Sequence, residues 1–249
     1  MKSRRKPRSV DAKQNKEIKQ LKTQVKKLVK AVETKSIDTH EIATVGNYAL
    51  VGGLFRYDIT AVPALQTNVT NSNDARVDTR IGNSLLVKRF EMNGMISLPS
   101  NIDIDGNTTP SYDTVVRALI VHTPGSATPG LPEILEHPNS VFSQYKRFPD
   151  NPYRVLYDKQ FDLQATIPNA ISGGTRNATA VEPFRRRIKI VLNSKQLGKS
   201  GIVVEYGQGN NGDDPVYGGL TMYFISSVSG VGFIQPELEA RTRLRYLDQ

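Results

Sequence analysis

The sequence predicts an all-β domain that follows a basic, partly helical N-terminal arm. After residue 37, short runs of β-forming residues alternate with clusters of turn-forming residues, and no long helical pattern occurs. Before it, positive charge is concentrated: residues 1–30 hold twelve Lys or Arg against two acidic residues, a surplus of ten, whereas the whole chain carries +9. Residues 31–249 therefore sum to −1. The chain combines a nearly neutral body, residues 38–249, with a basic arm, residues 1–37.

The arm is the part of the chain predicted to bind nucleic acid. Like charges cannot pack together, so residues 1–13 are expected to be solvated. Each cation that neutralises a phosphate releases a condensed counterion, which makes binding strong, salt-sensitive and independent of base sequence. The predicted nucleic-acid-binding residues are Lys2, Arg4, Arg5, Lys6, Arg8, Lys13, Lys16, Lys19, Lys22, Lys26, Lys27 and Lys30. The run RRKPR at residues 4–8 is also typical of a nuclear-localisation patch, so nuclear import machinery is a further expected partner.

Residues 13–35, approximately, favour an amphipathic helix. Apolar residues recur there at spacings of three, four, three and four, the a/d pattern of a heptad repeat. These residues, called the seam below, are Ile18, Leu21, Val25, Leu28 and Val32. A helix of this length is marginal in water by itself. We therefore expect the seam to be covered, either by the seams of symmetry-related copies in a dimeric or trimeric bundle or by the body of its own chain.

Length and composition limit the class of protein. A body of about 210 residues has the size of one β sandwich. The chain contains no cysteine, which excludes a disulfide framework and a thiolate site. No apolar run approaches the roughly 20 residues of a membrane span, and the basic N-terminus lacks the apolar region of a signal peptide. We expect neither membrane insertion nor secretion.

Eight runs of the body are expected to be strands. They are residues 54–62, 84–98, 114–122, 153–165, 184–192, 202–206, 217–227 and 233–247. The run TVVRALIVH at 114–122 is apolar enough for a strand buried on both faces, whereas residues 38–53 have the composition of a polar approach segment. Residues 131–148 favour one or two short helical turns at an end of the sandwich. Several connections of about ten to twenty residues are longer than hairpins need, which favours two Greek keys and hence an eight-stranded double-sheet jelly roll.

The sequence offers little for catalysis, so we expect no enzyme and assign no catalytic residue. His40, His122 and His137 are isolated along the chain. No cofactor is expected. Asp213 and Asp214 are candidates for a structural calcium site between subunits, with a plain turn as the alternative.

A second cluster of positive charge lies in the run FRRRIKIVL, residues 184–192. In a strand, Arg185, Arg187 and Lys189 share one face and Arg186, Ile188 and Ile190 the other. Two interpretations remain open for the first face. It is a solvated surface with salt bridges between subunits, or a second nucleic-acid contact inside an assembly.

Three stretches of the body carry a likeness to a known family. They are ARVDTRIGNSLLVKRFEMNGMIS (75–97), VVRALIVHTPG (115–125) and NPYRVLYDKQFDL (151–163), which together cover about a third of the chain in a consistent order. With the basic arm, the chain resembles the single-jelly-roll capsid proteins of small viruses. It resembles most the coats of circular Rep-encoding single-stranded DNA viruses and the similar coat of satellite tobacco necrosis virus.

The resemblance implies a structural protein of the virion. Sixty copies would form a T=1 icosahedral shell, with the arms directed inward onto a single-stranded genome and their helices bundled at the threefold axes. The coat would occupy the host nucleus or cytoplasm during assembly, and host nuclear import would be a partner. Many coats of circular-DNA viruses have longer, arginine-rich arms, whereas lysine dominates here from Lys13 onward. Circular single-stranded DNA is the expected cargo; a satellite-RNA virus coat and a non-viral nuclear nucleic-acid-binding module are the alternatives.

Overall fold

The computed structural model describes residues 14–24, 34–45, 55–61, 83–99, 113–125, 130–147, 149, 152–164, 184–207, 215–228 and 235–248. The chain divides into two compact units, Met1–Thr34 and Lys35–Gln249. The structure thus places the boundary three residues before the predicted end of the arm. Within its described residues, the first unit is a helix at 14–24. No described helix is both long enough and apolar enough to cross a membrane.

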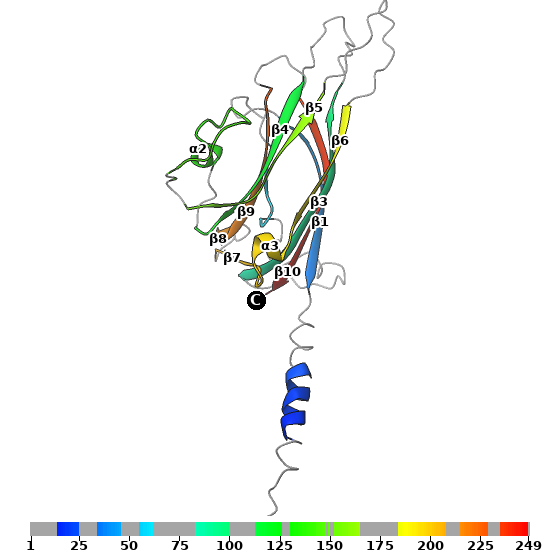
Figure 1. Ribbon diagram of the computed structural model, residues 1–249, viewed down its shortest axis with the longest axis vertical. Helices are drawn as coiled ribbons and strands as arrows, with labels where there is room; N and C mark the ends of the chain where they lie inside the picture. The colour runs from blue at the N-terminus through cyan, green and yellow to red at the C-terminus, as the bar shows by residue number, and fades with distance from the viewer. Residues whose placement is uncertain are drawn as a thin grey trace, which may run out of the picture. The chain divides into compact units, whose positions relative to one another are not determined.

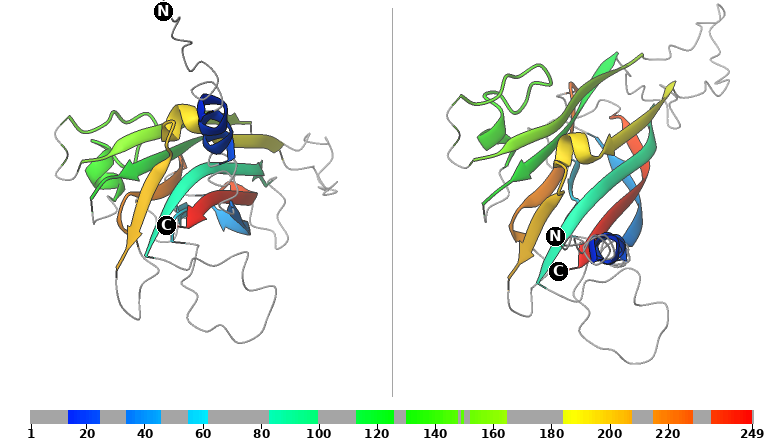
Figure 2. Two further views of the ribbon diagram at one scale, coloured as in Figure 1. Left: turned by 90° about the horizontal axis from the view of Figure 1, so that it is seen from below. Right: turned by 60° about the horizontal axis from the view of Figure 1, so that its bottom comes forward.

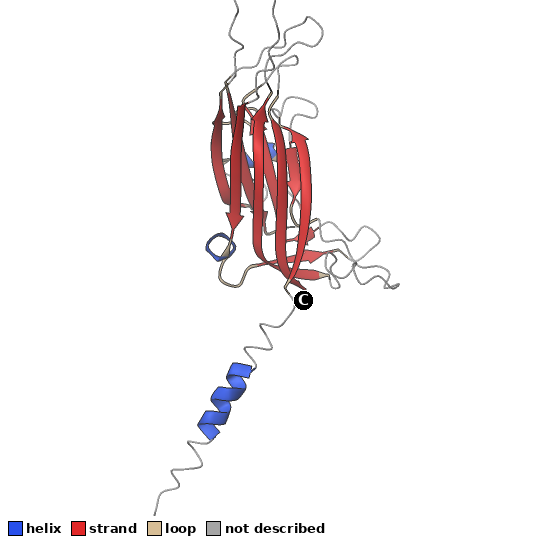
Figure 3. Cartoon of the chain, turned by 90° about the vertical axis from the view of Figure 1, so that its right-hand side faces the viewer, coloured by secondary structure: helices blue, strands red, loops and turns tan. Residues whose placement is uncertain are grey.

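The second unit is built from two antiparallel sheets (Figure 1). The larger sheet contains β1 (Lys35–Thr44), β10 (Glu237–Asp248), β3 (Ser84–Leu98), β6 (Phe184–Leu192), β7 (Ile202–Tyr206) and β8 (Pro215–Tyr217). The smaller sheet has the order β2 (Phe55–Asp58), β9 (Gly219–Ser226), β4 (Thr114–Thr123) and β5 (Arg154–Leu163). Figure 3 views the body from the side of the larger sheet, whose strands run side by side.

The long strand β3 organises the larger sheet. One edge of β3 pairs with β10, which in turn pairs with β1. The other edge is shared, because β6 pairs with residues 90–98 of β3 and β7 pairs with residues 84–87. The single helical turn α3 (Ser194–Leu197) connects β6 to β7. Asn193 caps α3: its side chain accepts a hydrogen bond from the Lys195 amide, and its own amide donates to the Gln196 side chain.

The strand order confirms the predicted fold class. Strands that follow one another along the chain change sheets, as from β1 to β2, β3 to β4 and β5 to β6, while β10 lies between β1 and β3 and β9 lies between β2 and β4. Nested antiparallel crossings of this kind are the two Greek keys of a jelly roll. Figure 2 shows the two sheets from two further directions.

The described residues form ten strands rather than the predicted eight. Residues 38–53 were predicted to be a polar approach, yet residues 35–44 form β1. The prediction was wrong because β1 lies at the sheet edge, where only Ile37 among its ten side chains is buried and polar residues are tolerated. The predicted strand 217–227 is interrupted at Gly218, whose positive φ of 75° separates β8 from β9.

The inner faces of the sheets enclose the main core. It is an apolar set of alternate residues that includes Phe90, Met92 and Ile96 of β3, Ala118 and Ile120 of β4, Ile188 and Ile190 of β6, and Met222 and Phe224 of β9. Gly94 lies in regular register opposite Ala240 of β10. A Cβ atom on Gly94 would stand 2.6 Å from the carbonyl oxygen of Glu239, so only glycine allows β3 and β10 to approach this closely.

A second core lies on the outer face of the smaller sheet, beneath residues 130–147, called the cover segment. The cover segment contains the helical turn α2 (Leu131–Ile134), which Figure 1 places on the side of β4 and β9 away from the larger sheet. Leu119 and Val121 of β4 and Tyr223 and Ile225 of β9 pack against apolar residues of the cover segment, namely Leu131, Ile134, Leu135 and Val141. The helical turn that was expected to cap one end of the sandwich therefore covers a sheet face, and β9 is buried on both sides.

A buried ion pair fixes the cover segment to the sheet. Arg117 of β4 has a side chain only 5% exposed and donates two hydrogen bonds to Asp158 of β5, with N···O distances of 2.9 and 2.8 Å. Its Nη1 donates to the carbonyl oxygens of Val141 (3.1 Å) and Ser143 (2.7 Å). The Tyr145 hydroxyl donates to Asp158, and the Arg117 guanidinium lies 5.3 Å from the Tyr145 ring centroid. The run 114–122 was predicted to be a strand buried on both faces, as β4 largely is, but the sequence analysis did not predict this network.

Candidate nucleic-acid interface

Three of the twelve predicted arm cations lie within the described residues. Lys16, Lys19 and Lys22 belong to the helix of residues 14–24, whose side chains are all exposed. The other predicted cations lie outside the described residues: Lys2, Arg4, Arg5, Lys6, Arg8, Lys13, Lys26, Lys27 and Lys30. For these nine cations, the residue type and the charge are known from the sequence alone.

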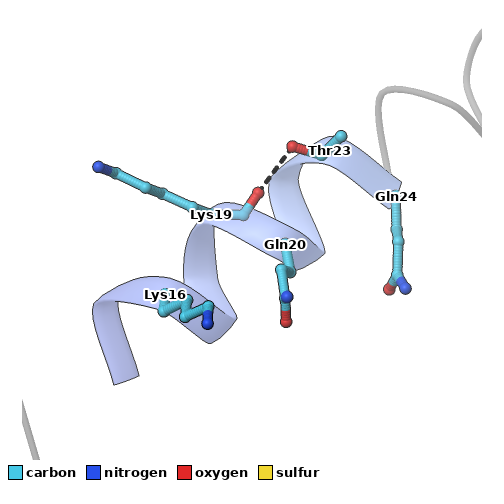
Figure 4. A pocket seen from close by; sticks show the side chains of 5 residues that line it. All are labelled: Lys16, Lys19, Gln20, Thr23 and Gln24. Carbon is cyan, nitrogen blue, oxygen red and sulfur yellow. Dashed lines mark hydrogen bonds between the residues drawn. The ribbon is translucent and has the colours of Figure 1, made fainter. Parts of the chain in front are cut away.

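One face of the helix is polar throughout (Figure 4). It is formed by Lys16, Lys19, Gln20, Thr23 and Gln24, which line a shallow hollow along the helix. The Thr23 hydroxyl donates a 2.8 Å hydrogen bond to the carbonyl oxygen of Lys19, one turn earlier. Lys16 and Lys19 are three residues apart in the helix and therefore lie on the same face, which suits phosphate oxygens rather than apolar ligands.

The seam occupies the opposite side of the same helix. At 3.6 residues per turn, Ile18 and Leu21 lie roughly half a turn away from the polar face. Their exposed fractions are 48% and 57%, which is high for large apolar side chains. Val25, Leu28 and Val32 lie outside the described residues. The described part of the arm is thus amphipathic: Lys16 and Lys19 lie on one side and Ile18 and Leu21 on the other. Lys22, one turn after Ile18, flanks the apolar side.

The outer face of the larger sheet is the second charged surface of the described chain. Arg243 of β10 donates to both carboxylate oxygens of Asp38 of β1 at 2.6 Å, and Arg89 forms an ion pair with Glu91 within β3. The hydrogen bond from Arg243, opposed by partial burial, lowers the pKa of Asp38 below its usual value. Asp38, Glu91 and Arg243 border a shallow hollow of about 500 Å³ that is also lined by His40 and Arg241. No group of three His, Cys, Asp or Glu suited to a metal ion occurs among the described residues.

The structure also places the three histidines and the calcium candidates. His40 lies 3.3 Å from Glu239 on the outer face of the larger sheet, although the two are far apart in sequence. Burial, together with the charge of Arg154, lowers the pKa of His122. His137 contributes its backbone amide to the Ser143 hydroxyl in the cover segment. Asp213 and Asp214 lie outside the described residues.

Comparisons with known proteins add a distant likeness only. No protein-family model matches the chain, and no curated protein matches its sequence. A solved structure from Desmodium yellow mottle tymovirus is similar at 12% identity, covering 87% of this chain and 85% of that chain, with a TM-score of 0.26. A superposition this poor supports no conclusion about function. The features of this chain that bear on function are its strand order and its charge distribution.

Proposed function

We propose that this protein is the coat protein of a small virus. In this proposal sixty copies close an icosahedral shell that packages single-stranded nucleic acid, circular single-stranded DNA in particular, and the protein is structural rather than catalytic. One observation carries the proposal. A segment with a net charge of +10, residues 1–30, is joined to a jelly-roll body with a net charge of −1. Double-sheet jelly rolls of this type are a common architecture of viral shells.

The arm supplies the attraction for the genome. Twelve cations per chain in sixty copies amount to about 700 positive charges, which suits a genome on the order of a thousand nucleotides. Counterion release makes this attraction independent of sequence, as packaging a whole genome requires. The amphipathic helix adds a second role, because its exposed Ile18 and Leu21 are available to pack against the same residues of neighbouring copies.

The proposal is tested by neutralising the arm without shortening it. In the variant, all twelve arm cations become Gln, which keeps the seam and the chain length intact. We expect purified wild-type particles to contain single-stranded nucleic acid and the variant to contain almost none, measured by the ratio of absorbance at 260 and 280 nm and by extraction. A variant that packages as much nucleic acid as the wild type would show that the arm is not the packaging element. Deletion of residues 1–30 should give the same loss.

A further inference from the structure

Strand β6 carries a column of three exposed cations on the outer face of the larger sheet. Arg185, Arg187 and Lys189, called the cationic column below, alternate along β6 with residues that point inward. Successive members are about 6.8 Å apart along the strand, because a strand rises about 3.4 Å per residue. None of the three forms an ion pair or hydrogen bond with another described side chain.

Arg186, which lies between two members of the column, behaves differently. Its Nη1 donates a 2.9 Å hydrogen bond to the carbonyl oxygen of Asp162 of β5, and its guanidinium lies 5.8 Å from the centroid of the Phe161 ring. Arg186 therefore connects the two sheets within the body. The three column residues make no comparable contact between the sheets, so their side chains differ from that of Arg186 in being directed to solvent.

The strand paired with β6 places no carboxylate directly opposite the column, and Glu91, the diagonal neighbour of Lys189, is already paired with Arg89. In register, Arg185 lies opposite Ser97, Arg187 opposite Met95, and Lys189 opposite Asn93 of β3. The nearest carboxylates in the same rows, Glu237 and Glu239 of β10, are two strands away. Two strand spacings are about 9.6 Å, close to the Debye length at physiological salt, so their attraction is largely screened.

Two other cations of this face, Arg243 and Arg89, are already paired. Arg243 is held by Asp38 and Arg89 by Glu91. Arg241 of β10 lies in the same row as Lys189, across Asn93, and extends the uncompensated charge toward β1. Neither the column nor Arg241 forms an ion pair with a described side chain, although Glu239 lies two residues from Arg241 along β10.

We propose that the cationic column, with Arg241, binds the phosphate backbone of single-stranded nucleic acid and that the outer face of the larger sheet is turned toward the packaged strand. The inference rests on the proposed packaging function and extends it from the arm to the body. The register neighbours Ser97, Met95 and Asn93 offer no aromatic ring for base stacking, so the contact is with phosphates and is independent of sequence. Along the chain, the arm continues directly into β1, which belongs to the same sheet as β6.

The test uses the full-length chain and two variants with equal charge changes. In the column variant, Arg185, Arg187 and Lys189 become Gln. In the control variant, three exposed cations outside β6 become Gln: Arg154 of β5, Lys195 of α3 and Lys199. Binding of a fluorescent mixed-sequence DNA single strand is measured by anisotropy over a range of NaCl concentrations, at protein concentrations where light scattering shows no particles.

We expect the column variant to lower the slope of log K against log salt by about 2, since each lost phosphate contact on a single strand reduces it by about 0.7. The control should keep the wild-type slope. A strand carrying photoreactive 5-iodouracil should crosslink to peptides of residues 184–192 in the wild type and lose this product in the column variant. All three full-length proteins keep the basic arm, so each of them should still bind the DNA strand.

Two results would overturn the inference while leaving the proposed function intact. In the first, the column and control variants show the same slope. In the second, the column variant keeps the wild-type slope but no longer forms particles, which would assign the column to salt bridges with an acidic surface of a neighbouring copy. If instead the wild-type chain neither binds single strands nor forms particles, the proposed function itself is wrong.

Discussion

The outer faces of the two sheets differ in what lies on them. The face of the smaller sheet is buried beneath the cover segment and holds a second apolar core. The face of the larger sheet carries alternating charged side chains that are largely exposed. Each face contains an arginine bound to an aspartate through two hydrogen bonds, Arg117 with Asp158 on the smaller sheet and Arg243 with Asp38 on the larger.

The two pairs differ in burial rather than in geometry. The side chains of Arg117 and Asp158 are 5% and 31% exposed, whereas those of Arg243 and Asp38 are 49% and 56% exposed. Removing one partner of a buried pair leaves an uncompensated charge away from water, but an exposed pair is solvated in either state. The buried face of the smaller sheet therefore contributes to stability, whereas the charged face of the larger sheet is exposed to solvent in the single chain.

The largest predicted effect comes from breaking the buried pair. We expect Arg117→Met to lower the free energy of unfolding by about 3–5 kcal/mol, because Asp158 loses its partner and the carbonyl oxygens of Val141 and Ser143 lose their donor. Urea unfolding followed by circular dichroism measures it. Arg243→Met is the matched control and should leave the unfolding midpoint near that of the wild type. Equal losses in both variants would contradict the distinction between the two faces.

A smaller loss is expected from the hydroxyl that completes the buried network. Tyr145→Phe removes the hydrogen bond donated to Asp158, and a bond to a charged group contributes about 1.5–3 kcal/mol. The same urea titration should show a decrease at the low end of this range, since Asp158 is partly accessible to water. Tyr217→Phe, at an exposed position, is the control and should have no effect. No change in Tyr145→Phe would mean that water replaces the hydroxyl at no cost.

The buried pair should also make the protein sensitive to acid. Burial by itself would raise the pKa of Asp158, but hydrogen bonds from Arg117 and Tyr145 and the guanidinium charge outweigh it, so the pKa is lowered in the folded state. This stabilisation is complete above the unfolded-state pKa of about 4 and is lost as pH falls through the folded-state value. The difference in stability between wild type and Asp158→Asn should therefore shrink as pH falls below about 4. A difference that stays constant across that range would show that the Asp158 carboxylate is not linked to folding.

The smallest effect is expected at the tip of the cover segment. Phe142 is 66% exposed, while the carbonyl groups of the residues on either side of it are held by Arg117. Phe142→Ala should change the free energy of unfolding by less than about 0.5 kcal/mol, as is usual for surface positions. Thermal melts of the two proteins at equal concentration provide the check. A loss comparable to that of Tyr145→Phe would mean that the ring packs in the folded body.

The sequence allowed the fold class to be predicted because strand period and turn composition are local signals. Alternation in residues 84–98 and 184–192 gave strand bounds that match β3 and β6. The edge strand β1 could not be found this way, because its exposed and half-buried positions do not require apolar residues.

The candidate sites also contain features that the sequence shows and features that only the structure shows. The excess charge of the arm is visible in composition, and the alternation of Arg185, Arg187 and Lys189 is visible in a strand pattern. Which cations remain unpaired is decided by register between distant strands, as with Asp38 and Arg243, 205 positions apart. Arg117 did carry a usable signal: a charged residue inside a buried apolar run requires a partner, although the sequence does not say which carboxylate it is.

The central claim, that this chain forms a closed shell around single-stranded nucleic acid, is tested most directly by negative-stain electron microscopy. The recombinant full-length protein is purified at moderate salt and imaged with its nucleic-acid content measured on the same sample. The account predicts uniform closed particles that contain nucleic acid. Monomers or small oligomers that bind single strands but never close would contradict it and favour a nucleic-acid-binding module without a shell.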